Sequence, residues 1–203
     1  MTKINRRDTL KLLGAAPAAA VAFTWTAEEA EVAAQQARQA RTQAAAANKP
    51  YAPRFFTAHE YATIVVLGDL IIPKDGRSGS ASDAGTPEFI DYLTSQQPDR
   101  QTAMRGGLAW LDNECRERFD KTFLASADAD RRKVLDDIAW PRRAKPDFSQ
   151  GGRFFNTMRD LVATGFWTSK IGVADLGYLG NTAVMEWTGA PQAILDRLGV
   201  KYE

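Results

Sequence analysis

Two side chains that carry much of protein chemistry are almost absent from this sequence. The chain of 203 residues contains one cysteine, Cys115, and one histidine, His59. A single cysteine can form no disulfide within the chain and no thiolate metal cluster. Haem ligation, transition-metal sites and Ser-His-Asp catalysis depend on histidine or cysteine side chains, of which the chain has only these two. The sequence therefore predicts a chain that is poorly equipped for catalysis.

A strong excess of charge and a membrane-length hydrophobic run are missing as well. The formal net charge is +1, from 26 Lys and Arg against 25 Asp and Glu, so nothing indicates a nucleic-acid binder. The apolar run over residues 12–25 is fourteen residues long, contains Pro17 and is rich in alanine. A spanning helix needs about 20 strongly apolar residues, so this run is too short and too weak.

The N-terminal stretch NRRDTLKLLGAAPAAAVAFTW is instead typical of an export signal. Lys3, Arg6 and Arg7 form a positive region ahead of the apolar run, and Ala20-Val21-Ala22 provides a signal-peptidase site. The order Asn-Arg-Arg-Asp-Thr-Leu-Lys resembles the twin-arginine motif of a route that exports folded proteins. We therefore expect residues 1–26 to be a twin-arginine signal peptide. The alternative is a chance Arg-Arg pair before an alanine-rich helix.

Residues 27–53 combine high helix propensity with a lack of large apolar side chains. The stretch AEEAEVAAQQARQARTQAAAA favours a helix but offers no face that would be buried deeply. We interpret it as a solvated helical linker, and a strip that packs on a partner is the alternative. Pro50 and Pro53 end any helix here, so we place the domain boundary before a folded region of residues 54–203.

Residues 54–203 show helical periodicity over most of their length. Thr57 and Glu60 form a capping box, Pro73 stops the first helix, and Thr86 caps a second helix that has Pro87 in its first turn. Longer helices are expected over residues 99–119, 126–140 (capped by Ser126) and 149–167. Alternating strand patterns and internal repeats are absent. The sequence predicts a single all-α domain of about five to six helices.

The segment from Thr168 onward differs from these helices. It carries glycines at 172, 177, 180 and 189, so we expect it to be mostly loop. Tyr178 and Trp187 are aromatic side chains of the kind that anchor protein interfaces. The segment either wraps the helical domain or lies against another protein. The alternative is that both rings complete the local core.

Several residues were candidates for chemistry. Asp112, Glu114, Glu117 and Asp120 lie on one expected helix, and without a neighbouring histidine we interpret them as a solvated face rather than a metal site. The loop KDGRSGS lacks the preceding strand and the Gly-Lys-Ser/Thr ending of a phosphate-binding loop.

The two rare side chains have ordinary interpretations. His59 lies in the first turn of a helix, where a local surface or capping role is expected. Cys115 falls on the apolar stripe of the helix over residues 99–119, which indicates a small buried hydrophobe. In an oxidising compartment it would alternatively be an intersubunit thiol that pairs with another chain.

Five segments taken in order resemble one family. They are the twin-arginine leader, FTAHEYATIVVLGDLIIPKD, SASDAGTPEFIDYL, GGLAWLD and GFWTSKIGVADLGYLGN. Together they resemble the small subunit (subunit 3, or gamma) of gluconate 2-dehydrogenase and related FAD-dependent sugar dehydrogenases, over about residues 54–192. The last segment is similar to a Gly-aromatic-Thr-Ser…Gly-Tyr-x-Gly-Asn pattern of that family, at Gly165, Trp167, Thr168, Ser169, Gly177, Tyr178, Gly180 and Asn181.

The resemblance implies an accessory role. Such subunits bind no flavin and do no chemistry; they associate with an FAD-containing large subunit of the glucose–methanol–choline type. The small subunit's leader carries the folded pair through the twin-arginine translocase into the periplasm, where the complex is membrane-associated and a multihaem cytochrome c subunit commonly takes the electrons. The expected partner interface comprises Trp167, Thr168, Ser169, Tyr178, Asn181 and Trp187.

Two other functions compete with this one. An uncut N-terminus would make the chain a structural protein that anchors a complex at the membrane. Alternatively, carboxylates such as Asp112 and Glu117 would serve a stand-alone periplasmic enzyme.

Overall fold

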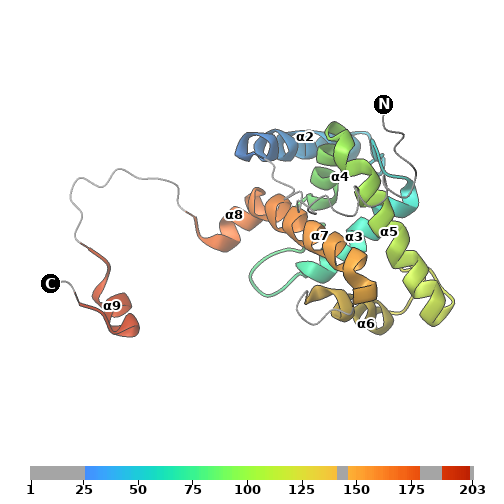
Figure 1. Ribbon diagram of the computed structural model, residues 1–203. Coiled ribbons are helices and arrows are strands. Elements are labelled where there is room, and N and C mark those ends of the chain that lie inside the picture. Colours follow the sequence, from blue (N-terminus) through green and yellow to red (C-terminus); the bar gives the residue numbers. More distant parts are fainter. Residues whose placement is uncertain (1–25, 141–145, 179–188, 202–203) are drawn as a thin grey trace, which may run out of the picture.

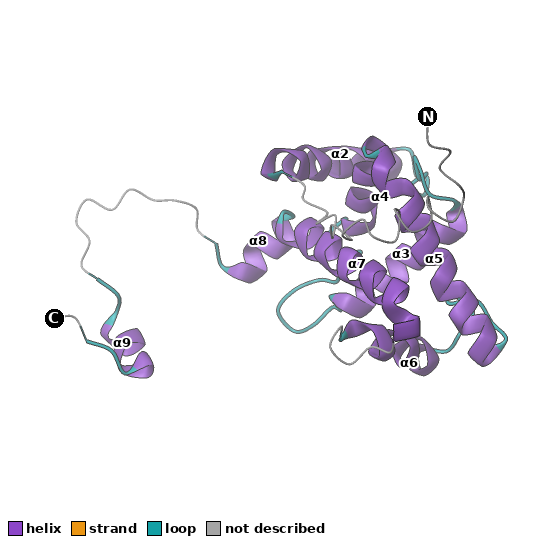
Figure 2. Ribbon diagram, viewed as in Figure 1, coloured by secondary structure: helices purple, strands orange, loops and turns teal. Residues whose placement is uncertain are grey.

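A computed structural model describes residues 26–140, 146–178 and 189–201 of the chain. Over these residues the fold is all-helical, which confirms the expected fold class (Figure 2). The helices are α2 (Ala27–Ala46), α3 (Ala58–Ile71), α4 (Thr86–Gln96), α5 (Pro98–Phe119), α6 (Asp128–Ala139), the 3₁₀ turn η1 (Pro146–Phe148), α7 (Ser149–Trp167), α8 (Lys170–Leu176) and α9 (Gln192–Leu198). The described α-helices exceed the expected number because α2, α8 and α9 add to it.

Helix α7 is the central element of the bundle, and helices α2 to α6 and α8 all contact it (Figure 1). Its apolar stripe is buried as the helical period predicts, at Phe154, Phe155, Met158, Leu161, Val162 and Phe166. The α5 stripe of Met104, Leu108, Leu111 and Cys115 is buried in the same core. Each large apolar side chain buried in this way contributes about 1.5–3 kcal/mol.

Helix α2 is not the solvated linker that its composition predicted. Ala30, Ala33, Ala34 and Ala37 recur at steps of three and one, and all four are buried against the core. The helix packs along α4 and reaches α7. Small side chains let two helix axes approach closely, so an alanine face is buried without any large apolar residue. The prediction was wrong because it equated burial with side-chain size.

The helix ends confirm one capping prediction and correct two others. The Glu60 N–H donates to Thr57 Oγ1 (3.2 Å), and the Thr57 N–H donates to Glu60 Oε2 (2.8 Å), which completes the capping box. Thr86 is already helical, and Gly85, at φ +83°, is the N-cap residue of α4. Helix α6 starts after Ala127 without a side-chain cap. Ser126 instead donates its hydroxyl to Thr122 O (2.9 Å), which turns the preceding loop.

The C-terminal segment is less loop-rich than its glycines predicted, because it contains α8 and α9. Helix α8 ends at Leu176 and is followed by Gly177, whose φ of +67° suits glycine. Helix α9 lies apart from the bundle (Figure 1). The expected leader with Arg6 and Arg7 lies outside the described residues. Within the parts of the chain that are described, no helix has the length and hydrophobicity needed to cross a bilayer.

Candidate interaction surface

Three of the four described residues of the expected interface lie at one corner, where α7 ends and α8 begins, and the fourth, Tyr178, lies past the other end of α8. Trp167 is the last residue of α7, and Thr168 and Ser169 form the connection to α8. Trp167 is 43% exposed and Tyr178, just beyond α8, is 56% exposed, so neither ring completes the core. Asn181 and Trp187 belong to the expected interface but lie outside the described residues.

Hydrogen bonds and close packing fix the shape of this corner. Thr168 Oγ1 donates to Thr164 O (2.8 Å), and the Gly172 N–H donates to Ser169 Oγ (3.0 Å). A Cβ atom on Gly172 would lie 2.1 Å from the Phe166 carbonyl oxygen, so the turn requires a glycine there. The Trp167 ring packs edge-on against the buried Phe166 ring, with centroids 5.7 Å apart. A surface ordered in this way loses little conformational entropy when it binds.

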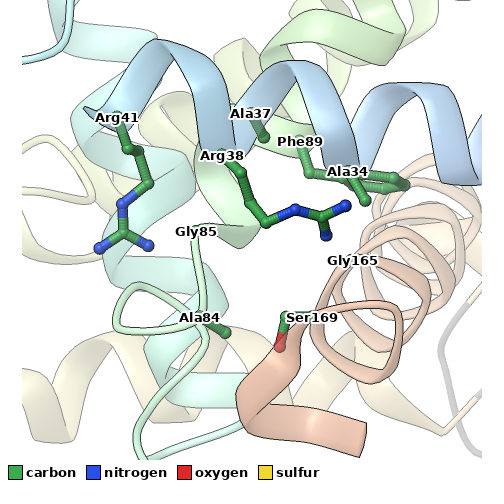
Figure 3. A pocket seen from close by; sticks show the side chains of 9 residues that line it. All are labelled: Ala34, Ala37, Arg38, Arg41, Ala84, Gly85, Phe89, Gly165 and Ser169. Atoms are coloured by element: carbon green, nitrogen blue, oxygen red, sulfur yellow. The ribbon is translucent and has the colours of Figure 1, made fainter. Parts of the chain in front are cut away.

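A pocket lies beside the corner, between α2, the loop that precedes α4, and the α7–α8 connection (Figure 3). The pocket is a small hollow whose space is continuous with solvent. Most of its walls are small residues, and two arginines provide its charge: Ala34, Ala37, Arg38, Arg41, Ala84, Gly85, Phe89, Gly165 and Ser169 line it. Sequence reasoning missed this pocket because three separate segments build it.

Arg41 is engaged by the chain itself. It donates to Asp83 O (3.0 Å), and its Nε lies 3.6 Å from Glu88 Oε1. Burial raises the pKa of the Glu88 carboxyl, while its backbone hydrogen bond and Arg41 act in the opposite direction. Arg41 therefore joins α2 to α4 and shapes one wall of the pocket. A side chain at Gly85 would collide with it, since a Cβ there lies 2.8 Å from Arg41 Nη1.

A second buried carboxylate, Asp91, lies farther along α4 and was not foreseen. It accepts hydrogen bonds from the Tyr51 hydroxyl (2.8 Å) and the Arg54 N–H (2.7 Å). The N–H groups of Phe55 and Phe56 also donate to it, both at 3.1 Å. Both carboxylate oxygens are thus occupied by the segment that connects α2 to α3. This arrangement makes Asp91 a structural anchor of that segment.

Asp112 does not lie on the solvated face that its spacing predicted. It is buried, its Oδ1 accepts from the Phe123 N–H (2.9 Å), and its Oδ2 lies 2.7 Å from His59 Nε2. The chain reverses at Asp120, whose φ is +55°, and this reversal returns Phe123 to α5. His59 therefore bridges α3 to α5 rather than acting within its own first turn.

The remaining carboxylates of α5 point in different directions. Glu114 pairs with Arg118, which also pairs with Asp137 of α6 at 2.6 Å, and Glu117 is exposed. Across residues 26–140, 146–178 and 189–201, no three His, Cys, Asp or Glu side chains are grouped as a metal site would require.

Cys115 is a buried hydrophobe, as its place on the stripe predicted. Its side chain is 0% exposed, and burial raises the pKa of its thiol. The core covers its sulfur, so the alternative, a disulfide with another chain, would require α5 to move away from its neighbours.

The loop KDGRSGS is closed by its own carboxylate. Asp75 Oδ1 accepts from the N–H groups of Arg77 and Ser78, both at 2.8 Å. These backbone hydrogen bonds lower the pKa of Asp75. Two N–H groups that a bound phosphate would use are therefore already occupied.

Over the described residues, the fold defines an all-helical protein with two exposed aromatic side chains near α8 and a basic pocket beside the connection between α7 and α8. Comparison with protein families goes further: the model of the family "Gluconate 2-dehydrogenase subunit 3" matches residues 58–186, which is more than half of the chain. The chain therefore belongs to the gluconate 2-dehydrogenase subunit 3 family, which confirms the resemblance. The match runs from α3 through α8 and begins beyond α2. Searches of curated proteins and of solved structures found no match.

Family membership identifies the chain with a subunit of a dehydrogenase complex. The family's description names a subunit of gluconate 2-dehydrogenase, which implies association with the other subunits of such a complex. The exposed corner at Trp167 lies inside the matched region, whereas Arg38 and Arg41 on α2 lie outside it.

Proposed function

We propose that this chain is the non-catalytic small subunit of a periplasmic, FAD-dependent sugar or gluconate dehydrogenase complex. The family match over residues 58–186 is the observation that carries the proposal. The large subunit, a flavoprotein of the glucose–methanol–choline type, holds FAD and oxidises the substrate. A multihaem cytochrome c subunit accepts the electrons. The small subunit supports the folding, stability and export of the flavoprotein.

Trp167, at the corner, and Tyr178, past the other end of α8, supply the surface for the large subunit. Trp and Tyr are enriched at the centres of protein interfaces, where each buries a large area and loses few rotamers on binding. Both rings are exposed in the isolated chain, and hydrogen bonds fix the turn between α7 and α8. Binding the flavoprotein would remove this apolar area from water.

The N-terminal sequence supports the export role. Arg6 and Arg7 form the twin-arginine signal, and the route they select carries proteins that are already folded. A flavoprotein has to fold around FAD before it crosses the membrane. A leader on the small subunit therefore exports the assembled pair, and the complex holds the chain at the periplasmic face of the membrane.

Removal of both exposed aromatic rings, Trp167 and Tyr178, is expected to weaken the complex strongly. In the variant that combines Trp167→Ala and Tyr178→Ala, flavin that co-purifies with the tagged chain should fall at least about tenfold, because aromatic anchors each contribute about 2 kcal/mol or more. The readout is flavin absorbance per tagged chain.

Trp140 provides the matched control for this experiment. It is an exposed tryptophan at the end of α6, away from the corner. Trp140→Ala should leave the flavin content unchanged. An equal loss in this control, or full flavin content in the variant that lacks both rings, would place the interface elsewhere.

A further inference from the structure

Arg38 in the pocket carries a charge that the described part of the chain does not neutralise. It lies on α2, one turn before Arg41, and its side chain extends over the pocket (Figure 3). Arg41 has Glu88 and the Asp83 carbonyl as partners. Arg38 is exposed, and no carboxylate among residues 26–140, 146–178 and 189–201 pairs with its guanidinium. Its five N–H donors remain available to a ligand.

Ser169 adds a second donor on the opposite side of the same pocket. Its side chain is only 6% exposed, and it lines the pocket from the α7–α8 connection. The oxygen accepts from the Gly172 N–H, which leaves the hydroxyl hydrogen to donate elsewhere. An exposed guanidinium and a nearly buried hydroxyl therefore face one space from two elements.

The walls between these donors restrict the size of what enters. Ala34, Ala37 and Ala84 present only methyl groups, and Gly85 and Gly165 present none. Gly165 has no room for a side chain, since a Cβ atom would lie 2.8 Å from the Phe89 ring. A guanidinium and a hydroxyl that line one pocket together offer donors for the two oxygens of a carboxylate.

We propose that this pocket receives the carboxylate of an Asp or Glu side chain from the large subunit, and that Arg38 and Ser169 bind it. This inference rests on the proposed function, because it names one contact of that complex. An exposed ion pair contributes almost nothing in water, so the pocket would not hold a free carboxylate tightly. Ser169 belongs to the expected interface, and a partner bound there would exclude water from the pair and strengthen it.

The position of Arg38 gives this contact a specific role. The family match begins at residue 58, so α2 adds a basic residue that the matched region does not contain. Charged contacts of this kind select partners and fix their orientation more than they raise affinity. Helix α2 therefore makes the chain selective for a large subunit with an acidic residue at the matching position.

The test uses the full tagged chain co-expressed with its flavoprotein large subunit. The measurement is flavin absorbance per tagged chain for wild type, Arg38→Glu, Arg38→Lys and the control Arg132→Glu. Arg132 is an exposed arginine on α6 that pairs with Asp128. Arg132→Glu changes the net charge by the same amount as Arg38→Glu. The melting temperature of each isolated variant reports whether it folds.

Reversal of the charge at Arg38 should lower the flavin content on the order of tenfold or more. Arg38→Lys should retain an intermediate amount, because lysine keeps the charge but loses the paired N–H donors. Arg132→Glu should match wild type, and all melting temperatures should agree.

Each other outcome has a distinct meaning. Normal flavin content in Arg38→Glu overturns the inference and leaves the proposed function intact. A wild-type chain that carries no flavin overturns the proposed function and the inference with it. Tight binding of glutamate or inorganic phosphate to the isolated wild-type chain, lost in Arg38→Glu, would reassign the pocket to a free anion and also overturn the inference.

Discussion

Replacement of Asp91 by alanine is expected to lower the free energy of unfolding by about 3–5 kcal/mol. The Asp91 side chain is fully buried and accepts four hydrogen bonds, from the Tyr51 hydroxyl and the N–H groups of Arg54, Phe55 and Phe56. Alanine would leave three backbone donors and one hydroxyl without their acceptor. Because domains of this size are stable by only about 5–15 kcal/mol, this change removes a large share of the total.

Urea unfolding of the full chain measures this effect, and two further variants separate its causes. Asp91→Asn keeps one acceptor oxygen but turns an NH₂ group toward N–H donors. Its free energy of unfolding should therefore lie between those of wild type and Asp91→Ala. Asp160→Ala removes an exposed carboxylate on α7 and should change stability by about 0.5 kcal/mol at most. If Asp91→Ala were no more destabilising than Asp160→Ala, the segment that connects α2 to α3 would not depend on this anchor.

Two neighbouring glycines of α5 are expected to respond to alanine with opposite signs. Gly107 faces α7, where an added Cβ would lie 1.9 Å from Cδ2 of the Phe154 ring. Because that ring is buried in the core, Gly107→Ala should destabilise the fold by about 1–3 kcal/mol. Gly106 has nothing within 4 Å of the same position. Gly106→Ala should stabilise the fold by up to about 1 kcal/mol, since alanine is the better helix former.

Thermal unfolding of the two variants measures this difference. Both substitutions replace glycine by alanine in α5, so their effects on the unfolded chain are nearly the same. The melting temperature should fall for Gly107→Ala and rise for Gly106→Ala. Equal shifts in one direction would mean that α5 and α7 do not approach each other at Gly107.

The helices with large apolar stripes were predictable from the sequence. The steps of three and four residues along α5 and α7 depend only on the chain's own spacing, so periodicity located both helices. Helix α2 shows where this reasoning fails. Burial of Ala33 depends on how close α4 comes, and no pattern within residues 27–46 reports that distance.

The candidate site divides in the same way. The sequence indicated Trp167 and Tyr178 as interface residues, because Gly, Thr and Ser lie next to them in the chain. Both rings are exposed in the structure. The pocket combines Arg38 with Ser169, which are more than a hundred residues apart in the chain, so only the packing of α2 reveals it. Asp112 was misjudged for a similar reason, because two of its partners come from other segments: His59 of α3 and the Phe123 N–H, which returns to α5 after the reversal at Asp120.

The visible absorption spectrum of the full chain, tagged after Glu203 and purified from the periplasm, tests most directly whether it is the small subunit of a flavoprotein complex. We predict flavin bands in the purified sample, together with a much larger oxidoreductase subunit. The same preparation from the variant with Arg6→Lys and Arg7→Lys should contain no flavin, because the pair would remain in the cytoplasm. A colourless chain without a partner, or flavin that reaches the periplasm normally in the double-lysine variant, would contradict this function.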